Sequence, residues 1–360
     1  MTALIGFEDL SKIFFGVHAV EGVSFAVEEG AVLGLIGENG AGKSTLMNMV
    51  GGVVPPTSGR MVWRGEAYAP RNAAEASARG VAFIHQELNL FFNLTVAENL
   101  FVDDFPKRLG LIDRRTIRAR AKALMDELDL EVSPDALIED LSPGERQLVE
   151  IAKALHRDAA LIIFDEPTTS LTPRETTRLF EVIGRLKAAG RTIIYISHVL
   201  ADVAQLCDTV AVLRDGKLVA TGPAAEFDIP AMIRAMIGRE LSGLFPDKHH
   251  TPGGSVVLHA DGLSQPGVLH QVSFSVHEGE ILGLFDLMGS GRTELARILF
   301  GLDPVADGTV MLGDAPLNGG PRERIASGLA FVTENRREEG LLMETPIAEN
   351  FSLVSLPSFA

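Results

Sequence analysis

Apolar residues in the first two thirds of the chain form short runs that alternate with stretches of helical periodicity. The runs are too short to cross a bilayer and are typical of buried strands, and they lie at residues 32–36, 80–84, 161–164, 192–196 and 209–213. Between them, apolar residues three and four positions apart mark two helical faces, one at Ile117, Ala121, Leu124, Met125 and Leu128 and one at Leu148, Ile151, Ala152 and Leu155. Alternating strands and helices predict an α/β fold with a mainly parallel sheet and helices packed against it.

An internal repeat relates the beginning of the chain to its later part. Residues 23–35 read VSFAVEEGAVLGL, and residues 272–284 read VSFSVHEGEILGL. The same spacing relates residues 37–46, GENGAGKSTL, to residues 286–295, DLMGSGRTEL. The chain therefore contains two related units.

The repeat also predicts the domain boundaries. We expect a first complete unit at residues 1–240, a polar linker with Pro and Gly at residues 241–254, and a partial second copy at residues 255–360. The second copy stops where the first has reached about residue 110. We therefore expect the second unit to be incomplete in this chain.

Charge and cysteine content exclude several classes of protein. Among 360 residues, 32 Lys and Arg against 48 Asp and Glu give a net charge of −16, which leaves no electrostatic basis for nucleic acid as a main partner. The single cysteine, Cys207, cannot form an intrachain disulfide and indicates a reducing compartment. The first residues lack the basic and long apolar segments of a secretory signal.

A glycine-rich segment follows the predicted strand at 32–36 and opens a helix. In this context glycines let backbone N–H groups approach phosphate oxygens, and the helix N-terminus adds partial positive charge. Lys43 would reach the β- and γ-phosphates of a nucleotide, and Ser44 would bind Mg²⁺. The predicted phosphate-binding residues are Gly37, Glu38, Asn39, Gly40, Ala41, Gly42, Lys43, Ser44 and Thr45.

Two adjacent carboxylates end the predicted strand at 161–164. Asp165 is suited to hold Mg²⁺ through water, and Glu166 is suited to polarise a water that attacks a phosphate. The pair therefore predicts a metal-assisted hydrolytic site when it is combined with the glycine-rich segment.

A third motif precedes the second predicted helix. Ser142 and Glu145 have the spacing of a capping box with Pro143 at the first helical position, so a local cap explains the motif by itself. A serine and a glycine at an exposed helix N-terminus also form an anion site, which could receive the γ-phosphate of a nucleotide held on another domain. The motif comprises Leu141, Ser142, Pro143, Gly144 and Glu145.

In their order along the chain, these three motifs resemble the ATP-binding cassette (ABC) family, and the resemblance covers nearly the whole chain. It implies a P-loop NTPase fold, with a RecA-like core, an antiparallel β subdomain and an α-helical subdomain, in two tandem copies of which the second is incomplete. It further implies that two such nucleotide-binding domains close head to tail, so that each ATP lies between the phosphate loop of one and the LSPGE signature of the other.

The resemblance also assigns roles to single residues. Gln86 looks like the glutamine that contacts Mg²⁺ and couples to the transporter, and His198 looks like the histidine that contacts the γ-phosphate. Residues 169–171 resemble the loop that crosses the dimer interface. Phe14 stands where the family places an aromatic ring against adenine, although Phe15 is adjacent.

The second unit departs from the first at the phosphate loop. Asp286 replaces Gly37, Arg292 replaces Lys43 and Thr293 replaces Ser44, while the glycines Gly289 and Gly291 keep the loop pattern, and Glu334 stands at the position of Gln86. A forked arginine need not fit the cradle of a lysine, and a carboxylate at Asp286 repels phosphate. We expect the second site to bind nucleotide weakly and to hydrolyse little.

The pairing of an intact loop with a GSGRTEL-type loop resembles the ATP-binding subunits of bacterial importers for simple sugars such as ribose, galactose and xylose. The resemblance implies an ATPase that uses ATP and Mg²⁺ to drive uptake of a simple sugar or nucleoside. Its implied partners are membrane permease subunits, an external solute-binding protein and a second nucleotide-binding domain, and its implied place is the cytoplasmic face of the cell membrane, without crossing it. An ABC-type translation factor on the ribosome and a non-catalytic nucleotide sensor are the alternatives.

One basic stretch interrupts the acidic trend of the chain. Residues 107–122 contain seven Lys or Arg and one Asp. A solvated helix face is the simpler interpretation. The alternative, contact with anionic lipid or with an acidic permease loop, follows from the resemblance, because the family places this region nearest the membrane.

Overall fold

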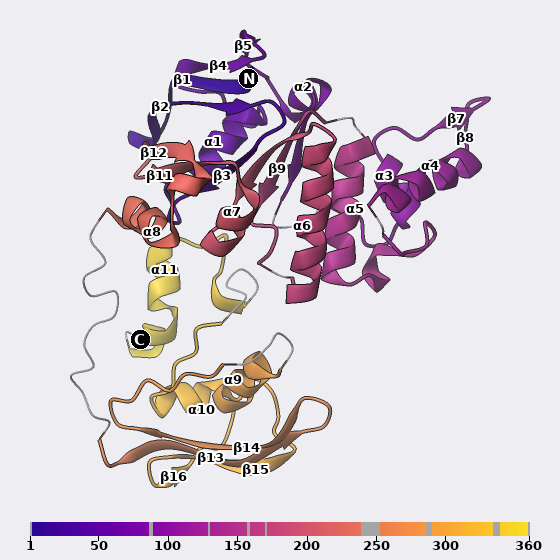
Figure 1. Ribbon diagram of the computed structural model, residues 1–360. Coiled ribbons are helices and arrows are strands. Elements are labelled where there is room, and N and C mark those ends of the chain that lie inside the picture. The colour runs from indigo at the N-terminus through magenta and orange to yellow at the C-terminus, as the bar shows by residue number, and fades with distance from the viewer. Residues whose placement is uncertain are drawn as a thin grey trace. The chain divides into compact units, whose positions relative to one another are not determined.

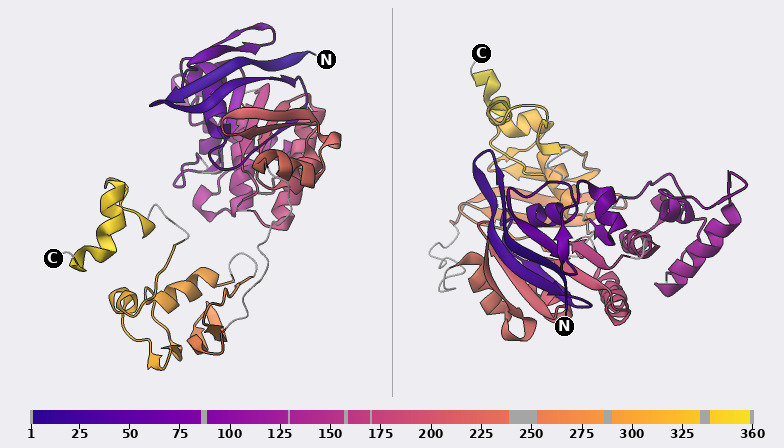
Figure 2. Two further views of the ribbon diagram at one scale, coloured as in Figure 1. Left: turned by 90° about the vertical axis from the view of Figure 1, so that its left-hand side faces the viewer. Right: turned by 90° about the horizontal axis from the view of Figure 1, so that it is seen from above.

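The chain folds as two compact units, Met1–Leu244 and Phe245–Ala360. The computed structural model (Figures 1 and 2) describes residues 2–85, 89–128, 130–156, 159–169, 171–238, 253–285, 290–333 and 339–358. No helix in these ranges is long and apolar enough to span a membrane.

Unit 1 contains an antiparallel sheet built from strands close together in sequence. Its strand order is β2-β1-β4-β5, with β1 (Ala3–Phe14), β2 (Val17–Glu28), β4 (Ser58–Trp63) and β5 (Glu66–Tyr68). Each of these strands pairs with its neighbour in antiparallel register. This sheet lies at the top of Figure 1.

The second sheet of unit 1 is mainly parallel and confirms all five strands predicted from the apolar runs. Its order is β12-β11-β3-β10-β9-β6, and only the edge pair β11–β12 is antiparallel. Non-consecutive neighbours are joined by helical crossovers, as expected for an α/β fold. The strands are β3 (Val32–Ile36), β6 (Val81–Ile84), β9 (Leu161–Asp165), β10 (Thr192–Ile196), β11 (Thr209–Arg214) and β12 (Lys217–Pro223).

Helices cover this parallel sheet, and both predicted helical faces belong to observed helices, α4 and α5. Side chains of β3 alternate between two cores: Val32 and Ile36 pack with the helices from α3 onward, whereas Leu33 and Leu35 pack with α1 and the antiparallel sheet. The helices are α1 (Lys43–Val50), α2 (Ala73–Ala78), α3 (Val96–Phe101), α4 (Arg114–Glu127), α5 (Pro143–His156), α6 (Pro173–Ala188), α7 (Leu200–Leu206) and α8 (Ile229–Ile237).

The basic stretch is not a single helix face. Its first part forms a small antiparallel hairpin, β7 (Lys107–Arg108) and β8 (Leu111–Ile112), and helix α4 begins only at Arg114. Asp113 accepts hydrogen bonds from the backbone N–H groups of Arg115 (3.2 Å) and Thr116 (3.1 Å), so the helix starts at this cap. In Figures 1 and 2 the hairpin projects away from the body of unit 1.

Unit 2 repeats the antiparallel sheet of unit 1. Its order, β14-β13-β15-β16, matches β2-β1-β4-β5 strand for strand, and the same helix follows the glycine-rich loop. The segments 281–285 and 329–333, which correspond to β3 and β6 in the repeat, form no strand. The elements are β13 (Val256–Gln265), β14 (Leu269–His277), α9 (Arg292–Phe300), β15 (Asp307–Leu312), β16 (Ala315–Pro316), α10 (Pro321–Ala326) and α11 (Ile347–Ser352).

Candidate nucleotide-binding and catalytic site

The glycine-rich loop of unit 1 connects β3 to α1 and holds Lys43 inside it. The ammonium of Lys43 donates hydrogen bonds to the carbonyl oxygens of Gly37 (2.7 Å) and Glu38 (3.0 Å), and the residue is only 7% exposed. Gly42 has φ 99°, and a Cβ at this position would lie 2.4 Å from the carbonyl oxygen of Ala19, so no other residue fits. The loop is therefore closed around a buried cation at the start of a helix.

Two carboxylates at the end of β9 face this cation. Burial lowers the pKa of Lys43, and the negative charges of Glu166 and Asp165 partly oppose the change. Burial raises the pKa of Asp165, and the neighbouring charge of Glu166 raises it further. Lys43, Asp165 and Glu166 therefore interact electrostatically at the carboxyl ends of β3 and β9, as the sequence predicts.

Glu166 is held by both its backbone and its side chain. Its N–H donates to the carbonyl oxygen of Ile196 (2.9 Å), at the end of β10, and its φ of 49° is a left-handed conformation that costs a non-glycine residue about 1 kcal/mol or more. The Nδ1 atom of His198 lies 3.3 Å from its Oε1 atom. The structure thus brings together the predicted catalytic pair, Glu166 and His198.

A buried network behind these two residues was not predicted from the sequence. Thr168 donates a hydrogen bond to Oδ2 of Asp202 (2.8 Å), and the hydroxyl of Tyr195 donates to the same oxygen (3.2 Å). Burial, followed by the charge of Asp202, raises the pKa of Tyr195. The network ties the segment after Glu166 to the helix after His198, and the only sequence signal was an acidic residue one helical turn beyond that histidine.

The LSPGE motif begins α5, and its predicted capping box is confirmed. The N–H of Ser142 donates to Oε2 of Glu145 (2.8 Å), and the N–H of Glu145 donates to the Ser142 hydroxyl (3.3 Å). Leu141, just before the cap, is buried, and α5 begins at Pro143. The interpretation of this motif as a helix cap is therefore confirmed.

A second carboxylate joins this motif to α6. Oε1 of Glu175 accepts a hydrogen bond from the N–H of Gly144 (3.0 Å), and Oε2 accepts from the N–H (2.9 Å) and hydroxyl (2.8 Å) of Thr172. Burial alone would raise the pKa of Glu175, but these hydrogen bonds and one with Ser142 hold it below its usual value. The capping box of Thr172 and Glu175 was readable from the sequence, whereas the bond to Gly144 was not.

The two candidate aromatic residues lie at the turn between β1 and β2. Phe14 is partly exposed, and the ammonium of Lys12 lies 5.0 Å from the centre of its ring. Phe15 is fully exposed at the turn. Both rings are accessible to a ligand, and neither belongs to the core.

Several predicted residues lie outside the described residues or in the second loop. Gln86, Ser170 of the segment 169–171, Asp286, Gly289 and Glu334 are not among those that the structure describes. In the second loop, Gly291 has φ 91° and precedes α9, where Arg292 is exposed and Thr293 is half-buried. Arg292 thus differs from its buried counterpart, Lys43.

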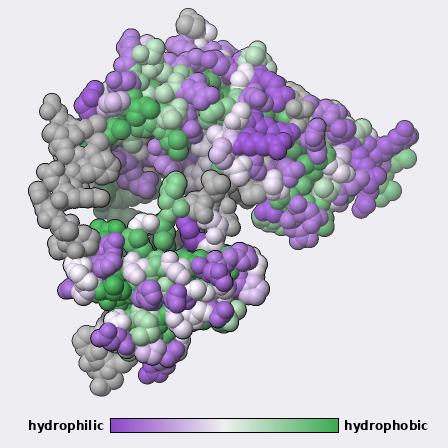
Figure 3. All heavy atoms as spheres, turned by 60° about the horizontal axis from the view of Figure 1, so that its bottom comes forward, coloured by the Kyte–Doolittle hydropathy of each residue, from purple (hydrophilic) through white to green (hydrophobic). Residues whose placement is uncertain are grey.

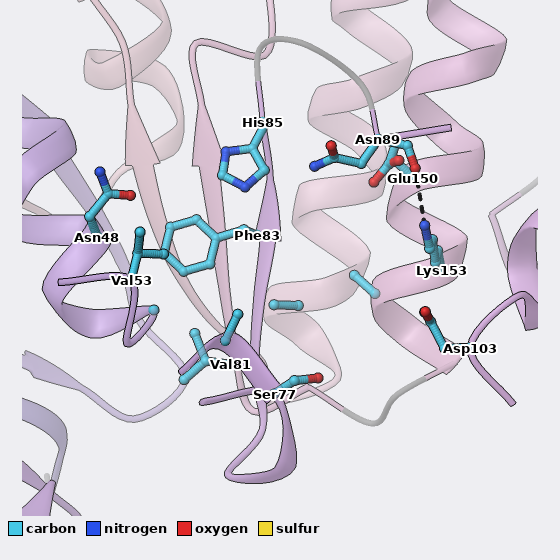
Figure 4. A pocket seen from close by; sticks show the side chains of 14 residues that line it. Asn48, Val53, Ser77, Val81, Phe83, His85, Asn89, Asp103, Glu150 and Lys153 are labelled. Atoms are coloured by element: carbon cyan, nitrogen blue, oxygen red, sulfur yellow. Dashed lines mark hydrogen bonds between the residues drawn. The ribbon is translucent and has the colours of Figure 1, made fainter. Parts of the chain in front are cut away.

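A groove of about 290 Å³ has His85 and Asn89 among its lining residues (Figure 4). His85, at the end of β6, stacks on Phe83 with ring centres 5.3 Å apart and lines one side. Lys153 of α5 lines the other side and donates a hydrogen bond to the carbonyl oxygen of Asn89 (3.1 Å). Asp103, just before the projecting hairpin, also lines this groove.

Comparisons with known proteins agree on one family. The sequence matches the ABC transporter family at residues 20–169 and 269–355. It is 42% identical to a putative ribose/galactose/methyl galactoside import ATP-binding protein 1 of Agrobacterium fabrum, over 99% of this chain and 70% of that protein. It is 42% identical to the ribose import ATP-binding protein RbsA of Bacillus licheniformis, over 99% and 72%, and 43% identical to the arabinose import ATP-binding protein AraG of Pseudomonas fluorescens, over 96% and 68%.

Solved structures give the same result for the fold. An ATP-binding cassette of an ABC transporter in its ADP conformation is 28% identical and has a TM-score of 0.59, covering 66% of this chain and 100% of that chain. A nucleotide-free cassette is 27% identical and has a TM-score of 0.58, covering 66% and 96%. These matches bear out the predicted P-loop NTPase fold of a cassette.

Proposed function

The chain belongs to the ABC transporter family, and we propose that it is the ATPase subunit of an importer that couples ATP hydrolysis to the uptake of a simple sugar. The observation that carries this proposal is the meeting of Lys43, Asp165, Glu166 and His198 at the carboxyl ends of adjacent strands. The names of the relatives, which are import ATP-binding proteins for ribose, galactose or arabinose, support import over a role on the ribosome.

The residues of the loop suit ATP and Mg²⁺. The Lys43 ammonium and the backbone N–H groups at the N-terminus of α1 are suitable donors for phosphate oxygens. The predicted phosphate-binding residues 37–45 include both. A hydroxyl at Ser44, a carboxylate at Asp165 and an amide at Gln86 are the oxygen donors that Mg²⁺ prefers, and these residues would hold it. When bound, the metal neutralises phosphate charge.

Glu166 would act on the attacking water. Its carboxylate accepts a proton from that water, and its fixed backbone holds it at the end of β9. His198, whose Nδ1 atom lies 3.3 Å from Oε1 of Glu166, would keep the carboxylate oriented and would donate a hydrogen bond to the γ-phosphate. Phe14, or the more exposed Phe15, would stack on the adenine ring.

A complete site needs a second nucleotide-binding domain. In the proposed closed state, Ser142 and Gly144 cover the γ-phosphate bound on the partner domain, and residues 169–171 cross the interface. Hydrolysis then releases the two domains. The second loop, with Arg292 exposed, contributes a weaker nucleotide site.

The proposed partners are a membrane permease and an external solute-binding protein, with this chain bound at the cytoplasmic face of the membrane. We place the permease contact at the groove of Figure 4, because His85 lines it and precedes Gln86, the residue predicted to couple the two proteins. Polar and apolar side chains share its walls, as at a typical non-obligate interface.

Uptake by cells that carry the chain with its permease and binding protein tests the proposal. Labelled ribose, galactose and arabinose are the first substrates to compare. Glu166→Gln should abolish uptake and ATP hydrolysis while ATP still binds, whereas Glu181→Gln, which neutralises an exposed glutamate on α6, should change neither. Hydrolysis that survives Glu166→Gln, or uptake that does not depend on the chain, would contradict the proposal.

Closure is tested separately by light scattering of the Glu166→Gln chain with and without Mg²⁺ and ATP. Dimers that form only with ATP would support head-to-tail closure between two copies of unit 1. A chain that binds ATP and stays monomeric would mean that two copies of unit 1 do not close on each other.

A further inference from the structure

The hairpin of residues 107–112 exposes aliphatic side chains that no described residue of unit 1 covers. Leu109 is 97% exposed, Leu111 is 76% exposed and Ile112 is 51% exposed. The hairpin projects beyond α4 in Figures 1 and 2, and Figure 3 shows hydrophobic and hydrophilic side chains together at this right-hand end of unit 1. A cluster of exposed aliphatic residues on a projecting tip is typical of an interaction surface.

The turn of this hairpin places leucine where local chemistry disfavours it. Arg108 pairs with Leu111, so Leu109 and Gly110 are the two turn residues, and both have positive φ, 53° and 81°. Such a turn favours Asn or Gly at its first position, because a branched side chain is strained at positive φ. Leu109 therefore costs free energy twice, through its strained backbone and through the exposure of its apolar side chain to water. Packing within unit 1 does not offset this cost, because the side chain is almost fully exposed.

Cations accompany these aliphatic residues. Lys107, Arg108, Arg114 and Arg115 are all exposed and form no ion pair with any residue in the described ranges. Asp113 caps α4 and lies near Arg108, and Glu98 of α3 interacts electrostatically with Arg114, so Lys107 and Arg108 are the cations closest to the turn. The tip is thus locally cationic on a chain whose net charge is −16, which suits an anionic surface.

The pairing of the hairpin favours a lipid surface over a protein groove. Lys107 pairs with Ile112 and Arg108 with Leu111, and these two pairs lie on opposite faces because side chains alternate along a strand. Each face therefore carries one cation and one aliphatic residue. A protein groove contacts one face, whereas the interfacial layer of a bilayer surrounds an inserted tip on every side.

We propose that the 107–112 hairpin inserts into the headgroup layer of a membrane that contains anionic lipid. Leu109 enters first, the two other aliphatic residues follow, and Lys107 and Arg108 remain at the level of the lipid phosphates. This inference rests on the proposed function, since the chain runs from Asp103, which lines the groove assigned to the permease, into the hairpin. The hairpin would align unit 1 with the membrane plane.

Flotation of the 360-residue chain with vesicles tests the insertion directly. We expect binding to vesicles of phosphatidylglycerol and phosphatidylcholine and little binding to phosphatidylcholine alone. Leu109→Asn should weaken vesicle binding about tenfold, the partition expected for burying one leucine, without lowering the unfolding temperature, because asparagine suits the turn. Lys107→Gln should weaken it about fivefold, and Arg120→Gln, the same charge change on the exposed face of α4, should weaken it less.

Each contrary result overturns the insertion. Unchanged binding by Leu109→Asn, equal binding to both vesicle types, or equal losses for Lys107→Gln and Arg120→Gln would each show that the hairpin does not insert. No vesicle binding, with a permease interaction that Leu109→Asn weakens, would assign the hairpin to the protein instead. ATP hydrolysis measured without lipid separates membrane insertion from the proposed ATPase function. The Leu109→Asn chain should hydrolyse ATP at the wild-type rate, because the turn takes no part in the nucleotide site.

Discussion

Nearly the same five-residue sequence has two outcomes in this chain. In unit 1, VLGLI at residues 32–36 is the buried strand β3, between β10 and β11. In unit 2, ILGLF at residues 281–285 forms no strand, and Ile281 and Phe285 are 97% and 98% exposed. The neighbours of β3 are β10 and β11, which come from far along unit 1, and no described strand of unit 2 lies beside residues 281–285. A parallel strand is thus specified by its partners as much as by its own sequence.

The antiparallel sheets, in contrast, have the same strand order in both units. The order β2-β1-β4-β5 is repeated as β14-β13-β15-β16 because all four strands of each sheet are close in sequence and pair with one another. Such a sheet needs nothing from the parallel core to complete its hydrogen bonds. Among the described residues of unit 2, the locally paired sheet is therefore formed, whereas segments 281–285 and 329–333 form no strand.

The largest expected difference between the units lies at their phosphate loops. Lys43→Ala should lower ATP hydrolysis about 100-fold or more, because it removes a buried cation from the site of charge development. Arg292→Ala, at the matching position, should change the rate by less than about twofold, because surface changes have small effects. Steady-state phosphate release by each variant measures this, and equal losses would mean that both loops support hydrolysis.

The matched glycines Gly34 and Gly283 should differ next. A Cβ at Gly34 would lie 2.6 Å from Cγ1 of Val203 and 3.0 Å from Sγ of Cys207, whereas nothing lies within 4 Å of one at Gly283. Gly34→Ala should lower the free energy of unfolding of unit 1 by about 1–3 kcal/mol, as overpacking does. Gly283→Ala should change it by less than about 0.5 kcal/mol.

Fluorescence in urea measures the glycine variants, because the single tryptophan, Trp63, is buried in β4 and reports unit 1. An equal shift of the urea midpoint for both variants would show that the environment of β3 is not specific to unit 1. The Gly283→Ala chain is the matched control for the chemical change itself.

The smallest expected effect concerns the carboxylate that links α5 to α6. Glu175→Gln should lower the free energy of unfolding of unit 1 by about 1 kcal/mol at neutral pH, since it removes a charged acceptor from two helix N-termini. The pKa of Glu175 is below its usual value in the folded chain, so this stabilisation is present above the unfolded pKa of 4.5 and is lost as pH falls through the folded pKa.

The difference between wild type and Glu175→Gln should therefore shrink below pH 4.5, as followed by Trp63 fluorescence in urea. Glu323→Gln alters a cap of unit 2, where Glu323 accepts a hydrogen bond from the N–H of Gly320, and should leave the Trp63 transition unchanged. A difference that stays constant as the pH falls would show that the charge of Glu175 does not stabilise unit 1.

The sequence predicts the local parts of this molecule well. The five strands predicted in unit 1, two of its helices and the capping box at Ser142 were inferred from apolar periodicity or from residues a few positions apart, and all are observed. The run of cations predicts a helix face over residues 107–122, whereas residues 107–112 form a hairpin; its two-residue turn has leucine in place of the usual asparagine, so the sequence gives no turn signal.

Hydrogen bonds between residues far apart in the chain could not be predicted from the sequence. The bond from Gly144 to Glu175 and the network of Thr168, Tyr195 and Asp202 join residues on different elements, and they exist only once the sheet order is set. The convergence of Lys43 with Asp165 and Glu166 was predictable only because each lies at the carboxyl end of a parallel strand. The sequence therefore predicts which residues end parallel strands on the same edge of the sheet. It does not predict which side chains on different elements form hydrogen bonds with each other.

Hydrogen exchange of the two related segments tests the central claim most directly. Amides of residues 32–36 should be protected with and without Mg²⁺ and ATP, because β3 is paired on both sides in its sheet. Amides of the loop residues 37–45 should gain protection with nucleotide, because these residues are predicted to bind its phosphates. Amides of residues 281–285 should exchange rapidly in both conditions, since they belong to no sheet. Equal protection of the two segments, or a gain with ATP at 281–285 and none at 32–45, would contradict the account.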